Sequence, residues 1–109
     1  MQTPLDITFR GMEPSPALEA AIRTWVERLE YDQVRIQRCS VTVEQPHHHH
    51  ARGNPFCYHI VLSAAGHDIA VSHKQGNEDA YVALGDAFRA ARRQLREVFA
   101  VRRHRLRTA

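Results

Sequence analysis

The hydrophobic residues of this chain change their spacing several times, and each change marks an expected element. Residues 5–10 alternate apolar and polar side chains, which predicts a half-buried first strand. Residues 18–29 then place apolar side chains three and four positions apart, the pattern of an amphipathic helix of about four turns. Ser15 offers an N-cap for this helix, and Pro16 suits its first position.

A period of two returns in the middle of the chain and predicts three more strands. Between residues 34 and 44 the apolar positions change parity near Gln37, so either a bulge lies there or the strand begins after it. Residues 56–62 and 69–71 give the next two strands. The short connection through Ala65-Gly66 favours an antiparallel hairpin between them.

The last apolar pattern is the longest and predicts a second helix. It begins after Gly76-Asn77, where Asn77, Glu78 or Asp79 can accept hydrogen bonds from the free amides of a first turn. Helical spacing then continues for about five turns. The apolar positions are Tyr81, Leu84, Phe88, Ala91, Leu95, Val98 and Phe99.

The expected element order is therefore β-α-β-β-β-α. A helix between the first two strands predicts a parallel, right-handed crossover, and the short later connections predict an antiparallel meander. Both amphipathic helices need apolar cover, and one sheet face can supply it. We predict an α+β fold of two layers, with a four-stranded mixed sheet and both helices packed on one face.

Composition fits one globular domain over residues 1–109, because 43% of the side chains are hydrophobic and 25% are charged. No apolar run approaches the roughly 20 residues of a membrane span, and the N-terminus lacks a signal-peptide pattern. We therefore expect a cytoplasmic protein with no membrane partner. In that reducing compartment Cys39 and Cys57 are expected to stay unpaired.

Charge divides the chain into two unequal parts. Residues 89–107 hold eight arginines and one acid, Glu97, which gives this segment a formal charge of +7. The preceding 88 residues hold seven basic and eleven acidic side chains, a balance of −4. The net charge of +3 thus hides a strong polarity. Such polarity indicates a polyanionic partner, with nucleic acid as the leading class.

On a helix, the first four of these arginines form one stripe beside the apolar face. Measured from Leu84 at about 100° per residue, Arg92, Arg96, Arg89 and Arg93 lie at roughly 80°, 120°, 140° and 180°. Guanidinium groups match phosphate through paired donors, so the stripe could follow a nucleic-acid backbone without reading bases. A solvated helix face is the alternative. The scarcity of acidic partners along the stripe favours the polyanion.

Four consecutive histidines, His47 to His50, lie between the second and third predicted strands. They could bind nickel or zinc opportunistically, but no Cys-x-x-Cys or His-x-x-x-His pattern supplies the converging ligands of a dedicated site. We expect a flexible hairpin loop and no cofactor. Enzymatic activity and a small-molecule substrate are not expected either, because the sequence has no nucleophile elbow and no glycine-rich phosphate loop.

The second predicted helix resembles that of the ribosome hibernation-promoting factors, also called ribosome-associated translation inhibitors or sigma-factor modulation proteins. The family motif is Asp-x-Tyr-x-Ala-Ile/Leu, followed by basic residues and Arg-Gln-Leu/Ile. The matching positions are Asp79, Tyr81, Ala83, Leu84, Arg93, Gln94 and Leu95. The first half is also similar, from Leu5-Asp6-Ile7-Thr8 to the strand that ends at Val43-Glu44. The predicted element order is that of this family.

The resemblance implies a short-form translation inhibitor. It would bind small-subunit ribosomal RNA near the decoding and tRNA channel and promote ribosome hibernation under stress, without catalysis. Many members have Lys where Ala90 and Glu97 stand, so the contacts would differ in detail. The basic end, residues 101–109, is expected to fray and to bind phosphate. The expected RNA-binding residues are Arg89, Arg92, Arg93 and Arg96, then Arg23 and Arg28, with Arg102 and Arg103.

Two other function classes stay open at this point. A general nucleic-acid-binding module would use the same arginines without ribosomal specificity. A metal-binding or interaction protein would instead use the histidines between residues 47 and 50.

Overall fold

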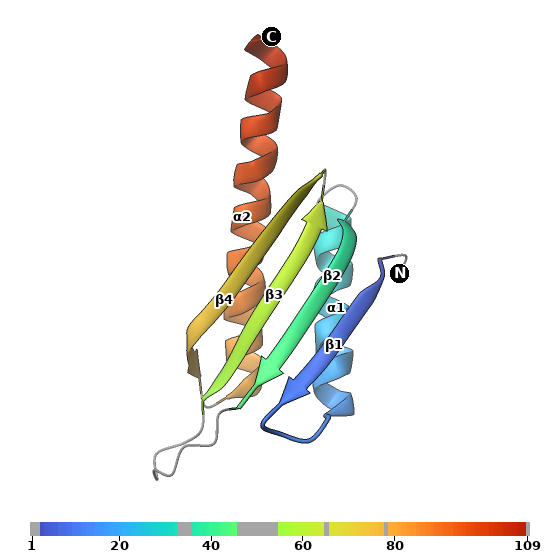
Figure 1. Cartoon of the computed structure of the whole chain (residues 1–109), viewed down its shortest axis with the longest axis vertical. Helices are drawn as coiled ribbons and strands as arrows, with labels where there is room; N and C mark the ends of the chain where they lie inside the picture. The colour runs from blue at the N-terminus through green and yellow to red at the C-terminus, as the bar shows by residue number, and fades with distance from the viewer. Residues whose placement is uncertain (1–2, 33–35, 46–54, 65, 78, 109) are drawn as a thin grey trace.

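The computed structural model describes residues 3–32, 36–45, 55–64, 66–77 and 79–108. Within these ranges, the side chains of residues 31–32, 73–77, 99 and 101–108 lie outside the description. The elements follow the predicted order (Figure 1). They are β1 (Leu5–Arg10), α1 (Pro16–Asp32), β2 (Ile36–Glu44), β3 (Phe56–Ala64), β4 (His67–Asn77) and α2 (Ala80–Thr108).

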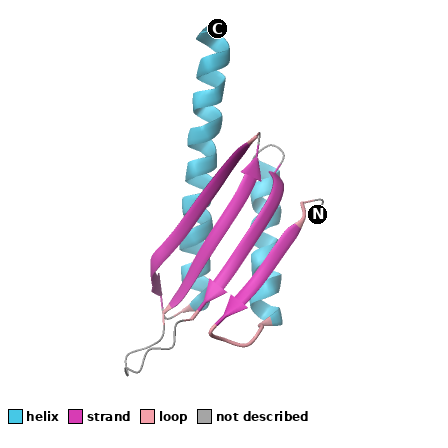
Figure 2. Ribbon diagram, in the orientation of Figure 1, coloured by secondary structure: helices cyan, strands magenta, loops and turns pink. Residues whose placement is uncertain are grey.

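The four strands form one mixed sheet in the order β1-β2-β3-β4. β1 pairs with β2 in parallel, whereas the β2–β3 and β3–β4 pairs are antiparallel. Both helices lie behind the same face of the sheet (Figure 2). The predicted two-layer α+β fold is therefore confirmed. β2 begins at Ile36, and its register against β3 shifts between Ile36 and Arg38, so of the two alternatives at Gln37 the structure has an irregularity within the strand.

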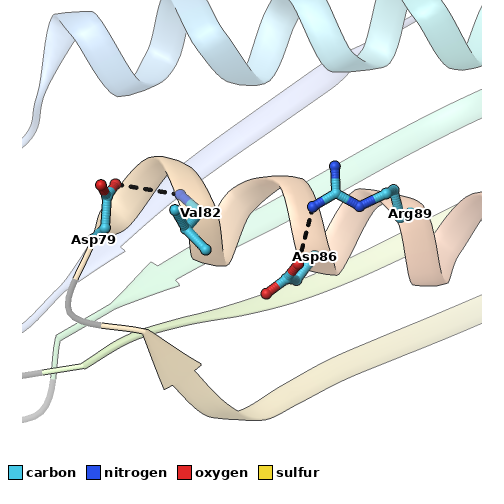
Figure 3. Close-up of polar contacts among 4 residues, drawn as sticks. All are labelled: Asp79, Val82, Asp86 and Arg89. Carbon is cyan, nitrogen blue, oxygen red and sulfur yellow. Dashed lines mark hydrogen bonds and ion pairs between the residues drawn. The ribbon is translucent and has the colours of Figure 1, made fainter.

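Both helices begin at predicted caps. The Ser15 hydroxyl oxygen accepts a hydrogen bond from the Leu18 amide at 3.2 Å. At the start of α2, the Asp79 carboxylate accepts from the amides of Tyr81 at 2.9 Å and Val82 at 3.3 Å (Figure 3 draws the second bond). Asp79, one of the three cap candidates before α2, thus satisfies first-turn amides, whereas Glu78 and the side chain of Asn77 lie outside the description.

The core lies between the sheet and the two helices. Phe88 of α2 and Ile22 of α1 are fully buried there, together with the inward side chains of the central strands. Tyr58 anchors the start of α2, because its hydroxyl donates to the Ala80 carbonyl at 2.9 Å. Burial, and then the neighbouring Tyr81 and Asp79, raise the pKa of the Tyr58 phenol well above its ordinary value.

Two features of α2 differ from the sequence expectation. Tyr81 was placed among the apolar positions, yet it is 53% exposed. By helical period it lies about 60° from Leu84, on the arginine side of the apolar stripe. In addition, α2 is 29 residues long, about eight turns where the apolar spacing gave about five. It continues past the end of the sheet (Figure 1). The fraying expected for residues 101–109 stays a prediction.

Cys39 and Cys57 form no disulfide bond, as expected. Burial, followed by the nearby Glu30 carboxylate, raises the pKa of the Cys39 thiol from 9.0 to about 12. The thiol is therefore protonated and unreactive at neutral pH.

We expect this thiol to make the protein less stable in alkali. Above its unfolded pKa of 9.0 the unfolded chain loses a proton that the native protein keeps. The free energy of unfolding should then fall by up to about 1.4 kcal/mol per pH unit, with no contribution below that pH. Urea unfolding at a series of pH values measures the slope. Cys39→Ala should show a shallower decline, and equal slopes in the two proteins would contradict this assignment.

Candidate nucleic-acid interface

The predicted arginine stripe lies on α2, beside the buried face. The exposure of each arginine follows its angle around α2 from the apolar stripe. Arg92 is nearest to that stripe and is partly buried. Arg89, Arg93 and Arg96 are exposed. Arg92 is therefore the member of the stripe that is held most closely by the fold.

A tryptophan from the other helix lies among these arginines. The guanidinium carbon of Arg28, on α1, lies 5.0 Å from the centre of the Trp25 ring. The guanidinium carbons of Arg89 and Arg92, on α2, lie 5.9 Å and 5.8 Å from the same centre. All three distances are within the range of cation–π attraction. Arg28, Arg89 and Arg92 together with Trp25 are called the Trp25 cluster below.

The core fixes the position of this tryptophan. Trp25 is half-buried and stacks on Phe88 of α2, with ring centres 5.8 Å apart and an interplanar angle of 14°. Phe88 is itself fully buried. The ring that the arginines surround is therefore attached to the hydrophobic core where the two helices meet.

Local contacts on α2 also orient Arg89. Its guanidinium donates to the Asp86 carboxylate at 2.9 Å, three residues earlier (Figure 3). It also lies over buried Gly85, where an added Cβ would meet a guanidinium nitrogen at 3.0 Å. The side chains of Arg89 and Asp86 are 57% and 43% exposed, so solvent screens the pair and it contributes at most about 1 kcal/mol. Asp86 was missed in the sequence because it precedes the basic segment.

A match to a protein-family model identifies the family of this chain. The model of the family described as "Sigma 54 modulation protein / S30EA ribosomal protein" matches residues 5–102. That range runs from the first residue of β1 into the last part of α2. The chain belongs to this family.

Two solved structures have folds similar to that of this chain. A ribosomal subunit interface protein from Coxiella burnetii is 15% identical, with a TM-score of 0.74, over 90% of this chain and 99% of its own. The N-terminal domain of Protein Y from Thermus thermophilus is 15% identical, with a TM-score of 0.70, over 89% and 99%. No curated protein gives a significant sequence match.

The motif that suggested the S30EA family divides into structural and exposed positions. Asp79 caps α2, while Leu84 and Leu95 are buried against the sheet. Arg93 and Gln94 are exposed. The motif therefore specifies how α2 begins and packs, and it places a basic residue on the outer side of the helix.

The structure brings together only some of the predicted RNA-binding residues. Arg28, a weaker candidate in the sequence, joins Arg89 and Arg92 in the Trp25 cluster. Arg23 is exposed on α1. Arg102 and Arg103 belong to α2, and their side chains lie outside the described part of the structure.

His47, His48, His49 and His50 lie outside the described residues, so the expected loop stays a prediction. Among the described residues, no group of three or more His, Cys, Asp or Glu side chains could hold a metal ion. In the same part of the chain, neither helix is long and apolar enough to cross a membrane.

The other sheet face carries a shallow hollow of about 500 Å³, lined by strand residues that include Arg10, Glu44 and His59. His59 and Ser72 form a hydrogen bond across β3 and β4 there. Ser63 and Asp68 form a similar bond across the same two strands at 2.7 Å. Such exposed cross-strand pairs are usual on the solvent face of an antiparallel sheet, so they indicate no catalytic arrangement.

Proposed function

We propose that this chain is a cytoplasmic, ribosome-associated translation inhibitor. It binds small-subunit ribosomal RNA near the decoding and tRNA channel and promotes ribosome hibernation under stress. The observation that carries the proposal is the gathering of arginines from both helices at one surface of an S30EA-family fold. A solved structure with the same fold is named a ribosomal subunit interface protein, which is consistent with a ribosomal partner.

The mechanism is occupancy and requires no chemical step. Arginine binds phosphate through paired N–H donors, and it stays charged at every physiological pH. A rigid helix that carries several arginines can therefore bind several phosphates of an RNA backbone at the same time. A protein bound in this way excludes other ligands from the same surface of the small subunit.

Co-sedimentation with purified small ribosomal subunits at two salt concentrations tests the proposal. If the four arginines of the stripe each contact one phosphate, the binding constant should fall about 50- to 150-fold between about 50 and 200 mM salt. Absence of binding at low salt, or binding insensitive to salt, would exclude this mechanism.

A general RNA-binding module is the second candidate, because phosphate contacts carry no sequence information. Competition distinguishes the two functions. Unrelated duplex RNA should compete poorly with the small subunit for the translation inhibitor. Competition with equal potency, expressed per phosphate, would favour the general module.

A further inference from the structure

We propose that Trp25 is the positioning residue of a compact phosphate site, in which Arg28, Arg89 and Arg92 converge on one or two neighbouring phosphates of an RNA backbone. This inference rests on the proposed function for its natural ligand. It goes further in assigning the tightest contacts to a site shared by both helices, and it gives a role to an aromatic residue.

The geometry supports convergence. Three guanidinium carbons lie within 6 Å of one ring centre, and they come from two different helices. A stripe on a single helix would instead place its charges along a line. A guanidinium has five N–H donors, so one that lies beside an aromatic ring can still offer donors to a ligand. The three groups can therefore receive anionic oxygens while they remain against the indole.

The electrostatics also favour an anion at this place. Three like charges around one ring repel one another, and the ion pair with Asp86 offsets one of them. The electron-rich indole face offsets a further part of the repulsion. A phosphate group would reduce this repulsion and accept hydrogen bonds from several donors at the same time.

Trp25 lowers the entropic cost of forming such a site. A free arginine side chain samples many rotamers, and binding must select a few of them. Contact with a ring that is stacked on the buried Phe88 restricts the three arginines before the ligand arrives. Arg93 and Arg96 are exposed farther around α2, and we assign them to general attraction.

The first experiment uses the protein without ribosomes. Trp25 is the only tryptophan of the chain, so intrinsic tryptophan fluorescence reports on this site alone. Titration with tripolyphosphate, and separately with a ten-nucleotide oligouridylate, should change the tryptophan emission until the change saturates. The double variant Arg28→Ala/Arg92→Ala should lose the change. The control Arg10→Ala/Arg38→Ala removes the same charge from exposed positions on the sheet and should keep it.

Absence of a saturable change in the wild-type protein would overturn the phosphate site, and so would an equal loss in both double variants. A saturable change without any ribosome binding would support the phosphate site and reject the proposed ribosomal function. The two proposals can thus fail separately.

The second experiment tests positioning by Trp25 through small-subunit binding. Trp25→Leu keeps an apolar side chain without a π face and should weaken binding about tenfold, with a shallower salt dependence. Trp25→Phe keeps an aromatic face and should restore most of the affinity. In the Arg28→Ala/Arg92→Ala background, Trp25→Leu should reduce the binding affinity little further, because two of the arginines that Trp25 positions are absent.

A merely structural role for Trp25 predicts a different pattern. The Leu and Phe variants would then melt at lower temperature but keep the wild-type salt dependence. Equal affinities for the two variants, or a full additional loss in the arginine-free background, would overturn the positioning role. Circular dichroism identifies any variant that does not fold, and Trp25→Phe still tests the idea if the Leu variant fails to fold.

Discussion

Replacing Arg89, Arg92, Arg93 and Arg96 together by alanine should weaken small-subunit binding about a hundredfold or more, while the fold stays intact. Three of the four side chains are exposed, and alanine is an excellent helix former, so α2 should persist. The loss comes from charge-assisted hydrogen bonds to phosphate and from the counterions released on binding. Co-sedimentation measures the affinity, and circular dichroism with thermal unfolding monitors the fold.

The salt dependence of small-subunit binding by this variant is a second, independent test of the stripe. Removal of four positive charges from the RNA-facing surface should make the dependence of binding on salt much shallower. Arg10→Ala/Arg38→Ala, on exposed sheet positions, should change affinity and slope much less. If the quadruple variant binds as the wild type does, the stripe is only a solvated helix face.

Phe88→Ala should lower the free energy of unfolding by about 3–5 kcal/mol. Phe88 is fully buried on α2 and stacks on Trp25 of α1, so its removal opens a cavity where the two helices meet. Urea unfolding measures the change in the free energy of unfolding.

Val82→Ala provides the matched control on the same helix. Val82 is 44% exposed in the first turn of α2, so its truncation should change stability by no more than about 0.5 kcal/mol. A loss below about 1 kcal/mol for Phe88→Ala would mean that the helices close over the missing ring with little cost.

The fold could be predicted from the sequence because the strand period of two and the helical period of about 3.6 residues occur in separate segments. Alternation from residue 5 to residue 10 and helical spacing from residue 18 to residue 29 each allow one interpretation. The parity change near Gln37 coincides with the register shift between Ile36 and Arg38. The length of α2 could not be read from the apolar spacing, because beyond the sheet a helix has no core to cover and its apolar pattern ends.

The site was predicted only in part, for a physical reason. Helical period places arginines relative to one another on α2, but it carries no information about which residue of α1 lies opposite. Trp25 lies within the apolar spacing of residues 18–29, and that spacing does not show that arginines surround it. In the structure it is half-buried beneath three guanidinium groups. Contacts between helices depend on how both pack on the sheet, which a single pattern does not encode.

The projection of α2 beyond the sheet converts an uneven distribution of charge along the sequence into an electric dipole in space. The segment from residue 89 to residue 107 has a charge of +7, and its later half extends away from a body that is on balance acidic. The field of a polyanion therefore exerts a torque on the free protein and turns the basic end toward itself. Orientation in this sense begins before any contact forms, and added salt shortens the distance over which it acts.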